Sequence, residues 1–110
     1  MKLPNLENAY IEPKKLYDYL LSKIHPVGMW KAKFFRAHGF DETNSDLLKQ
    51  QLMTIIHSED VKDVTLSPFG TKYIIDGEIK TPAGSTVKVR TVWIIDEGED
   101  RPRLVTAFPG

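Results

Sequence analysis

Cationic and hydroxyl side chains are grouped in four short segments of the sequence. His25 and Lys31 lie six positions apart in the first segment, and each of the other three segments combines a cation with a hydroxyl group. These three pairs are Lys72 with Tyr73, Arg90 with Thr91, and Arg103 with Thr106. Metal-independent cleavage of RNA uses such side chains: a proton carrier serves the 2′-hydroxyl and the leaving oxygen, and cations stabilise charge on the phosphorane. Histidine carries protons near neutral pH, while lysine and arginine bind phosphate.

Several of these residues also have a purely structural interpretation. His25 precedes a proline, so its ring can cap the end of a helix, and Lys31 can lie on the solvated face of an amphipathic helix. Tyr73 shares one face of an expected strand with apolar residues and can belong to the core. The tryptophans, Trp30 and Trp93, are more typical of a core than of a surface on which bases stack.

Length and composition indicate one ordinary globular domain that spans residues 1–110. Hydrophobic residues make up 41% of the chain and charged residues 27%, and 15 Lys and Arg balance 15 Asp and Glu. The chain therefore lacks the overall basic charge of a non-specific nucleic-acid-binding protein, although a local basic patch is compatible with it. The absence of cysteine excludes disulfides and thiol catalysis.

Other classes of function lack their sequence signatures. The chain has no Gly-rich phosphate loop, dinucleotide fingerprint, nucleophile elbow or paired-histidine metal helix. The acidic run at residues 96–100 is typical of a solvated turn, so we predict no metal site and no cofactor. No apolar stretch approaches the roughly 20 residues of a membrane span, and the first residues do not resemble a secretion signal. We expect a cytoplasmic protein outside the membrane.

The first half of the chain predicts three helices. A first helix over residues 13–23 starts at Pro13, which suits the first helical position. A second helix over residues 29–38 ends at Gly39. A third helix runs to about residue 57 from a cap at Asn44 or Ser45.

The second half of the chain predicts four strands that pair antiparallel. The strongest is residues 85–95, where alternation places apolar side chains on one face and cations such as Arg90 on the other. A cation in the middle of a strand must be solvated, paired or used. The other strands are expected at residues 61–66, 71–79 and 103–108, with short turns between them. The predicted fold class is α+β, with three N-terminal helices packed on a four-stranded antiparallel sheet.

Five motifs follow one another along the chain: His25-Pro26-x-Gly28-x-x-Lys31-Ala32-x-x-Phe35, Gly39-Phe40, Phe69-Gly70-Thr71-Lys72-Tyr73, Val89-Arg90-Thr91-x-Trp93-Ile94 and Pro102-Arg103-Leu104-x-Thr106. On these motifs, residues 3–109 resemble an uncharacterised bacterial domain that occurs as short stand-alone proteins. A similar domain forms the C-terminal tips of filamentous-haemagglutinin-type contact-dependent inhibition proteins. Such toxic tips often belong to the nuclease group typified by barnase, EndoU, the nuclease colicins and RelE toxins, whose N-terminal helices precede a four-stranded antiparallel sheet.

The resemblance implies a metal-independent endoribonuclease toxin that cleaves RNA and is paired with a small antitoxin or immunity protein. In this hypothesis His25 is the general acid or base, and Lys31 and Arg90 bind the scissile phosphate. The remaining motif residues orient or bind the RNA: Thr106 or Tyr73 at the nucleophile or leaving group, and Lys72, Thr91 and Arg103 on the rest of the substrate.

Two alternatives are compatible with the same residues. One is a non-catalytic interaction module whose cationic strand binds an acidic partner, which the balanced charge favours. The other is a toxin of different chemistry on the same fold. The ribonuclease hypothesis requires Lys31 and Arg90 to lie on the same side of the molecule and to share a single cleft sized for a nucleotide.

Overall fold

Helical segments form the first half of the chain and a single sheet forms the second half. The computed structural model describes residues 1–22 and 29–110. The helical elements are η1 (Leu6–Asn8), α1 (Pro13–Lys15), the π-helical turn η2 (Leu16–Leu20), α2 (Met29–Ala37), η3 (Glu42–Asn44) and α3 (Ser45–Ser58). The strands are β1 (Asp63–Ser67), β2 (Gly70–Lys80), β3 (Thr86–Asp96) and β4 (Arg103–Pro109). All neighbouring strands pair antiparallel in the order β1-β2-β3-β4, so the α+β prediction is confirmed.

The helix α2 ends at Ala37, and Gly39 lies in its C-terminal cap, as expected. The φ angle of this residue is +96°, which glycine adopts without steric penalty. The amide of Phe40 donates to the carbonyl of Phe35 and the amide of Gly39 to that of Arg36, both at 3.0 Å. This pair of bonds satisfies carbonyl groups that the end of the helix would otherwise leave unpaired.

The helix α3 begins at Ser45 with Asn44 at its N-cap position, as predicted, but the capping hydrogen bonds differ from the prediction. Asn44 precedes the helix but makes no side-chain capping bond to it. Instead Asp41 caps the preceding turn η3, since its carboxylate accepts from the amide of Thr43 while Asn44 Oδ1 accepts from the amide of Asp41. The reciprocal bonds form a capping box one short turn earlier than expected.

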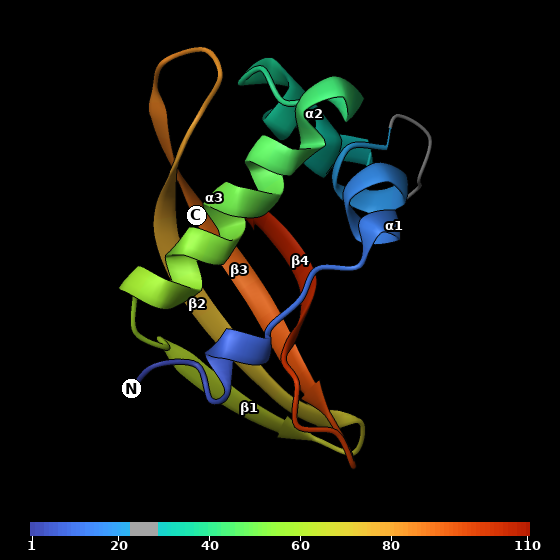
Figure 1. The fold of residues 1–110 in the computed structure, drawn as a ribbon, viewed down its shortest axis with the longest axis vertical. Coiled ribbons are helices and arrows are strands. Elements are labelled where there is room, and N and C mark those ends of the chain that lie inside the picture. The colour runs from blue at the N-terminus through green and yellow to red at the C-terminus, as the bar shows by residue number, and fades with distance from the viewer. Residues whose placement is uncertain (23–28) are drawn as a thin grey trace.

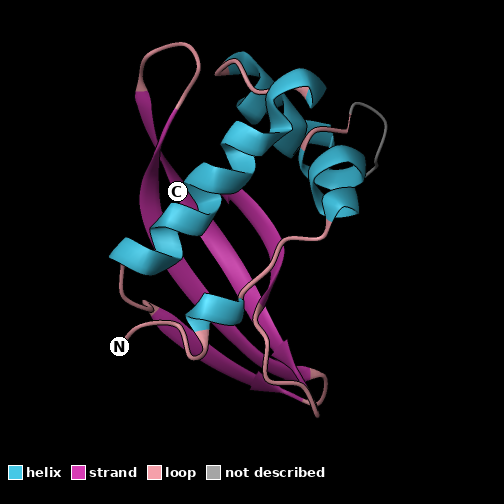
Figure 2. Ribbon diagram, viewed as in Figure 1, coloured by secondary structure: helices cyan, strands magenta, loops and turns pink. Residues whose placement is uncertain are grey.

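The core lies between α3 and one face of the sheet. Figure 1 shows α3 crossing this face, while α1 and α2 lie beside β4. The strand residues beneath the helix are fully buried, among them Ile75 and Trp93. Gly77 allows the close approach, because a Cβ atom at this position would lie 2.9 Å from Cγ1 of Ile55. The segregation of helices and strands in Figure 2 is that of a two-layer α+β domain.

The N-terminal segment pairs with the edge of the sheet, which the sequence did not predict. Tyr10 forms an isolated parallel bridge with Arg103. Its amide donates to the carbonyl of Pro102 at 3.0 Å, and its carbonyl accepts from the amide of Leu104 at 3.1 Å. The start of β4 is therefore paired on both of its edges.

The second face of the sheet carries four of the eight predicted site residues. Residues that pair directly across antiparallel strands share a face, so the register assigns each side chain. We use the term open face for the set Lys72, Ile74 and Asp76 on β2, Arg90, Val92 and Ile94 on β3, and Arg103, Thr106 and Phe108 on β4. Ile94 is 3% exposed, but it is not a member of the core cluster beneath α3. The others are half-buried or exposed, so they are available to solvent or to a ligand.

Candidate functional site

A β-bulge places Thr106 on the open face. Trp93 pairs with Leu104 and Val92 pairs with Thr106, so Val105 is an extra residue in β4. In a regular strand Leu104 and Thr106 would point to the same side, but the extra residue turns them to opposite faces. Leu104 is buried in the core, whereas Thr106 is half-buried on the other side.

Lys31 reaches Thr106 from the neighbouring helix α2. Its Nζ donates to Thr106 Oγ1 at 2.8 Å, although the two residues are 75 positions apart in the sequence. Lys31 is only 8% exposed. Its ammonium group lies 5.3 Å from the ring centroid of Phe108 and 5.5 Å from that of Trp30. The structure thus combines a buried cation, a hydroxyl group and two aromatic rings.

Arg90 lies on the same face, one strand away. It pairs directly across the sheet with Phe108, the residue whose ring Lys31 contacts. Directly paired side chains on antiparallel strands have Cβ atoms about 5 Å apart. Lys31 contacts the ring of Phe108, and Arg90 is the cross-strand neighbour of Phe108, so both cations lie on the same side of the sheet. The two pockets described below are lined by neither residue, and a cleft shared by Lys31 and Arg90 stays a prediction.

The guanidinium of Arg90 is already held by a carboxylate. Its Nε and Nη2 donate to the two oxygens of Asp76 at 2.8 and 3.0 Å. These hydrogen bonds are the main reason that the pKa of Asp76 lies below its usual value, and a bond from Lys62 acts in the same direction. An incoming phosphate would have to share Arg90 with Asp76 or displace the carboxylate.

Arg103 and Lys72 lie at the other end of the open face. They are the cross-strand partners of Ile94, one on each side. Arg103 donates to both oxygens of Asp96, at 2.7 and 3.0 Å, and lowers the pKa of that carboxyl. Lys72 is exposed, and its side chain makes no hydrogen bond or ion pair with the residues that the structure describes. Along β3, Ile94 of this row is four residues from Arg90, which corresponds to about 13 Å.

Two of the predicted site residues lie on the opposite face, in the core. Tyr73 is 8% exposed and belongs to the hydrophobic cluster. Thr91 is fully buried, where its hydroxyl donates to the carbonyl of Ile75 at 2.7 Å and accepts from Trp93 Nε1 at 2.9 Å. Both side chains therefore have a packing role. His25 lies outside the described residues.

The two tryptophans differ in their environment. Trp93 is fully buried, as the sequence suggested, but Trp30 is 54% exposed, so the expectation of a core position for Trp30 was wrong. The sequence also gave no indication of Phe108 as a site residue, because its face depends on the bulge at Val105. Asp76 was missed as the partner of Arg90, although the strand alternation placed both cation and carboxylate on the outer face.

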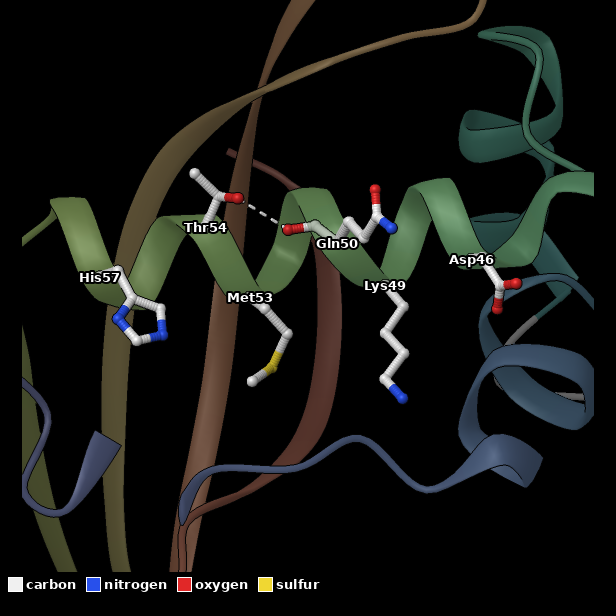
Figure 3. Close-up of a pocket in the computed structure, with 6 residues that line it drawn as sticks. All are labelled: Asp46, Lys49, Gln50, Met53, Thr54 and His57. Atoms are coloured by element: carbon white, nitrogen blue, oxygen red, sulfur yellow. Dashed lines mark hydrogen bonds between the residues drawn. The ribbon is translucent and has the colours of Figure 1, made fainter. Parts of the chain in front are cut away.

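A pocket of about 650 Å³ lies elsewhere, along the outer side of α3. Its lining consists of Asp46, Lys49, Gln50, Met53, Thr54 and His57. Figure 3 shows Lys49, Met53 and His57 directed to one side of the helix, and the hydroxyl of Thr54 bonded to the carbonyl of Gln50. All six residues come from one helix, and none of the predicted site residues is among them.

A second pocket, of about 540 Å³, includes Asp76. The other lining residues are Ser58, Glu59, Gly77, Glu78, Lys88, Val89 and Gly110. Three of these eight side chains are carboxylates and one is a lysine, so this pocket is less suited to a phosphate than the face around Lys31.

Two further features concern metals and membranes. Among the side chains that the structure describes, no group of three or more His, Asp or Glu is arranged to hold a metal ion. Among the helices of the same residues, none has the length and hydrophobicity needed to span a bilayer.

A family model described as a domain of unknown function, DUF6883, matches residues 2–110. The chain belongs to the DUF6883 family. No curated protein matches it. The sequence resemblance to an uncharacterised domain is thus confirmed at the level of the family.

The DUF6883 fold also occurs in a solved structure of a bacterial toxin system. One chain of a contact-dependent growth inhibition toxin–immunity protein complex from Klebsiella pneumoniae 342 superposes with a TM-score of 0.74. The match covers 91% of this chain and 98% of that chain, at 17% sequence identity. At this identity the likeness establishes a shared fold.

Proposed function

We propose that this domain is a metal-independent endoribonuclease toxin whose active site lies on the open face around Lys31, Thr106 and Arg90. The observation that carries the proposal is the 2.8 Å hydrogen bond between Lys31 and Thr106 beside Phe108, whose cross-strand neighbour is Arg90. The bond joins a cation of a helix to a hydroxyl group of a strand, and Arg90 lies on the neighbouring strand of the same face. The likeness to one chain of a toxin–immunity protein complex supports a role as the toxin or the immunity protein of such a pair, and the cations of the open face favour the toxin.

The proposed chemistry is an attack of the RNA 2′-hydroxyl on the adjacent phosphorus. The new P–O bond forms a 2′,3′-cyclic phosphate as the bond to the 5′-oxygen breaks, and a proton moves from the 2′-hydroxyl to that leaving oxygen. Lys31 and Arg90 stabilise the negative charge on the phosphorane oxygens. Thr106 orients the nucleophile or the leaving group, and His25 is the proposed proton carrier.

The remaining cations of the open face would bind the flanking phosphates. Arg103 and Lys72 lie about 13 Å from the Arg90 position along β3, so an RNA strand laid on the face contacts cations at both ends. Arginine binds phosphate through two parallel hydrogen bonds, the same geometry with which Arg103 now holds Asp96.

The direct test is incubation of the purified protein with total RNA in the presence of a chelator. We expect cleavage of at least one class of RNA, with 2′,3′-cyclic phosphate ends. Intact RNA at micromolar protein, across ribosomal, messenger and transfer RNA, would overturn the proposal.

A second candidate function is a protein-binding module of a toxin–immunity pair. It is favoured by the carboxylates that already pair with Arg90 and Arg103, and by the exposure of Leu66 (81%) and Phe69 (76%) at β1 and its turn. A module of this kind causes no growth defect on expression and forms a stable complex with the product of a neighbouring gene. A ribonuclease toxin arrests growth unless that product is present.

A further inference from the structure

Trp30 has an environment that packing does not explain. Tryptophan is among the residues with the largest buried areas on average, yet this side chain is 54% exposed at the start of α2. The next two residues of the helix, Lys31 and Ala32, are buried, with exposed fractions of 8% and 1%. The helix therefore directs its lysine inward and leaves its largest aromatic ring at the surface.

The exposed ring lies next to the proposed phosphate-binding cation. Lys31 Nζ is 5.5 Å from the Trp30 centroid and 5.3 Å from the Phe108 centroid. A nucleotide carries its phosphate and its base on the same sugar. A phosphate bound at Lys31 consequently brings the attached base within reach of these rings.

We infer that Trp30 is a stacking platform for a base of single-stranded RNA whose phosphate is bound at Lys31. This inference rests on the proposed function and adds a binding subsite to it. Proteins that bind single strands combine cations along the backbone with aromatic rings that stack on the bases. The ring of the half-buried Phe108 lies 5.3 Å from the same ammonium group and supports the same subsite.

The two tryptophans provide a direct readout of this site. Trp93 is fully buried and reports on the core, whereas Trp30 is accessible to a ligand. The probe is a single-stranded RNA oligonucleotide with 2′-O-methyl groups, which lacks the nucleophile and cannot be cleaved. We expect it to quench the fluorescence of the wild-type protein and to leave that of Trp30→Phe, where only Trp93 emits, unchanged.

Affinity for the same probe separates stacking from other contacts. Loss of one stacked base weakens binding by about 10-fold, so Trp30→Ala should raise Kd by that factor and Trp30→Phe by much less. The matched control is Phe69→Ala, which removes an exposed aromatic ring at the β1–β2 turn and should leave Kd unchanged. Far-UV circular dichroism and the unfolding midpoint of each variant verify that the fold is intact.

The outcomes distinguish this inference from the proposed function. Quenching and the Trp30→Ala effect without cleavage of ordinary RNA would support the subsite and overturn the ribonuclease. Cleavage of RNA with an unchanged Kd and KM for Trp30→Ala would overturn the subsite alone. Absence of any oligonucleotide binding, or an effect of Trp30→Ala only on binding of a partner protein, would also overturn the subsite.

Discussion

Lys31 donates a 2.8 Å hydrogen bond to the hydroxyl of Thr106, and the bulge at Val105 is what turns that hydroxyl to the open face. The helix α2 and the strand β4 are thereby joined by a charged donor and a neutral acceptor. Bulges are over-represented next to active sites because they redirect a side chain without breaking the sheet. The arrangement makes the Lys31–Thr106 pair the centre of the proposed site.

Thr106→Val should destabilise the domain. Valine has the shape of threonine but no hydroxyl group, so the buried ammonium of Lys31 loses this acceptor. Hydrogen bonds to charged groups contribute about 2 kcal/mol, and we expect the free energy of unfolding in urea to fall by that amount. Thr65→Val on the exposed part of β1 is the matched control. A loss below about 0.5 kcal/mol would show that the bond contributes little to stability.

Acid should weaken the domain through Asp76 and Asp96. Hydrogen bonds from Arg90 and Arg103 hold the pKa of each carboxyl below its usual value of 3.8. Because the folded state binds these protons less readily than the unfolded state, the stabilisation is complete above about pH 4 and is lost as the pH falls through the lowered pKa.

The measurement is urea unfolding between about pH 2 and pH 6, because this range covers the titration of the two carboxyl groups. Each pair is partly exposed, so Asp76→Asn and Asp96→Asn should each remove about 0.5–1 kcal/mol near neutral pH and flatten the acid limb. Asp100→Asn, in the exposed turn before β4, is the control. An unchanged acid limb in Asp76→Asn together with Asp96→Asn would contradict this assignment.

Arg90→Lys should lower RNA cleavage while the fold persists. Lysine keeps the charge but loses the planar group that binds two oxygens at once. We expect a fall in kcat of about 100-fold, and relief of growth arrest by Arg90→Ala. Lys88→Ala, an exposed lysine two residues away on the same face of β3, should retain activity. Equal loss in the two variants would indicate a general electrostatic effect.

Gly77→Ala should disturb the packing of α3 on the sheet. The added Cβ would lie 2.9 Å from Cγ1 and 3.0 Å from Cγ2 of Ile55. Forcing an atom into a packed core costs about 1–3 kcal/mol, which equilibrium unfolding measures. In an Ile55→Ala background the clash is absent, so the same glycine substitution should cost less there. Equal costs in both backgrounds would place the strain elsewhere.

The elements of the fold could be predicted because each has a local signal. Alternation in residues 85–95 gave β3 and its buried face, and Gly39 gave the end of α2. The N-cap position of α3 was predicted, but the capping hydrogen bonds were not, because Asp41, Thr43, Asn44 and Ser45 are all good capping residues and their competition depends on the turn before the helix. The pairing of Tyr10 with β4 is a long-range contact with no local signal.

The predicted site was harder, because a cationic residue in the sequence does not reveal its partner or its face. Strand alternation separates Lys72 and Arg90 from Tyr73 and Thr91, yet the site hypothesis included all four, and the structure buries Tyr73 and Thr91 on the core face. Strict alternation predicts that Thr106 and Leu104 lie on the same face of the strand. The bulge at Val105 places them on opposite faces. Burial of Lys31 depends on how α2 lies against β4, which helical spacing does not specify.

The most direct test of the account is a double-mutant cycle on kcat for RNA cleavage in chelator, with wild type, Lys31→Met, Thr106→Val and the double variant. Residues that act as one unit are strongly non-additive. We predict that each single substitution lowers kcat by about 100-fold or more. The double variant should be no less active than the less active of the two single variants. The control, Lys33→Met on the exposed side of α2, should remain active. Full activity of either single variant, or strictly additive losses, would contradict the claim that Lys31 and Thr106 form one catalytic pair.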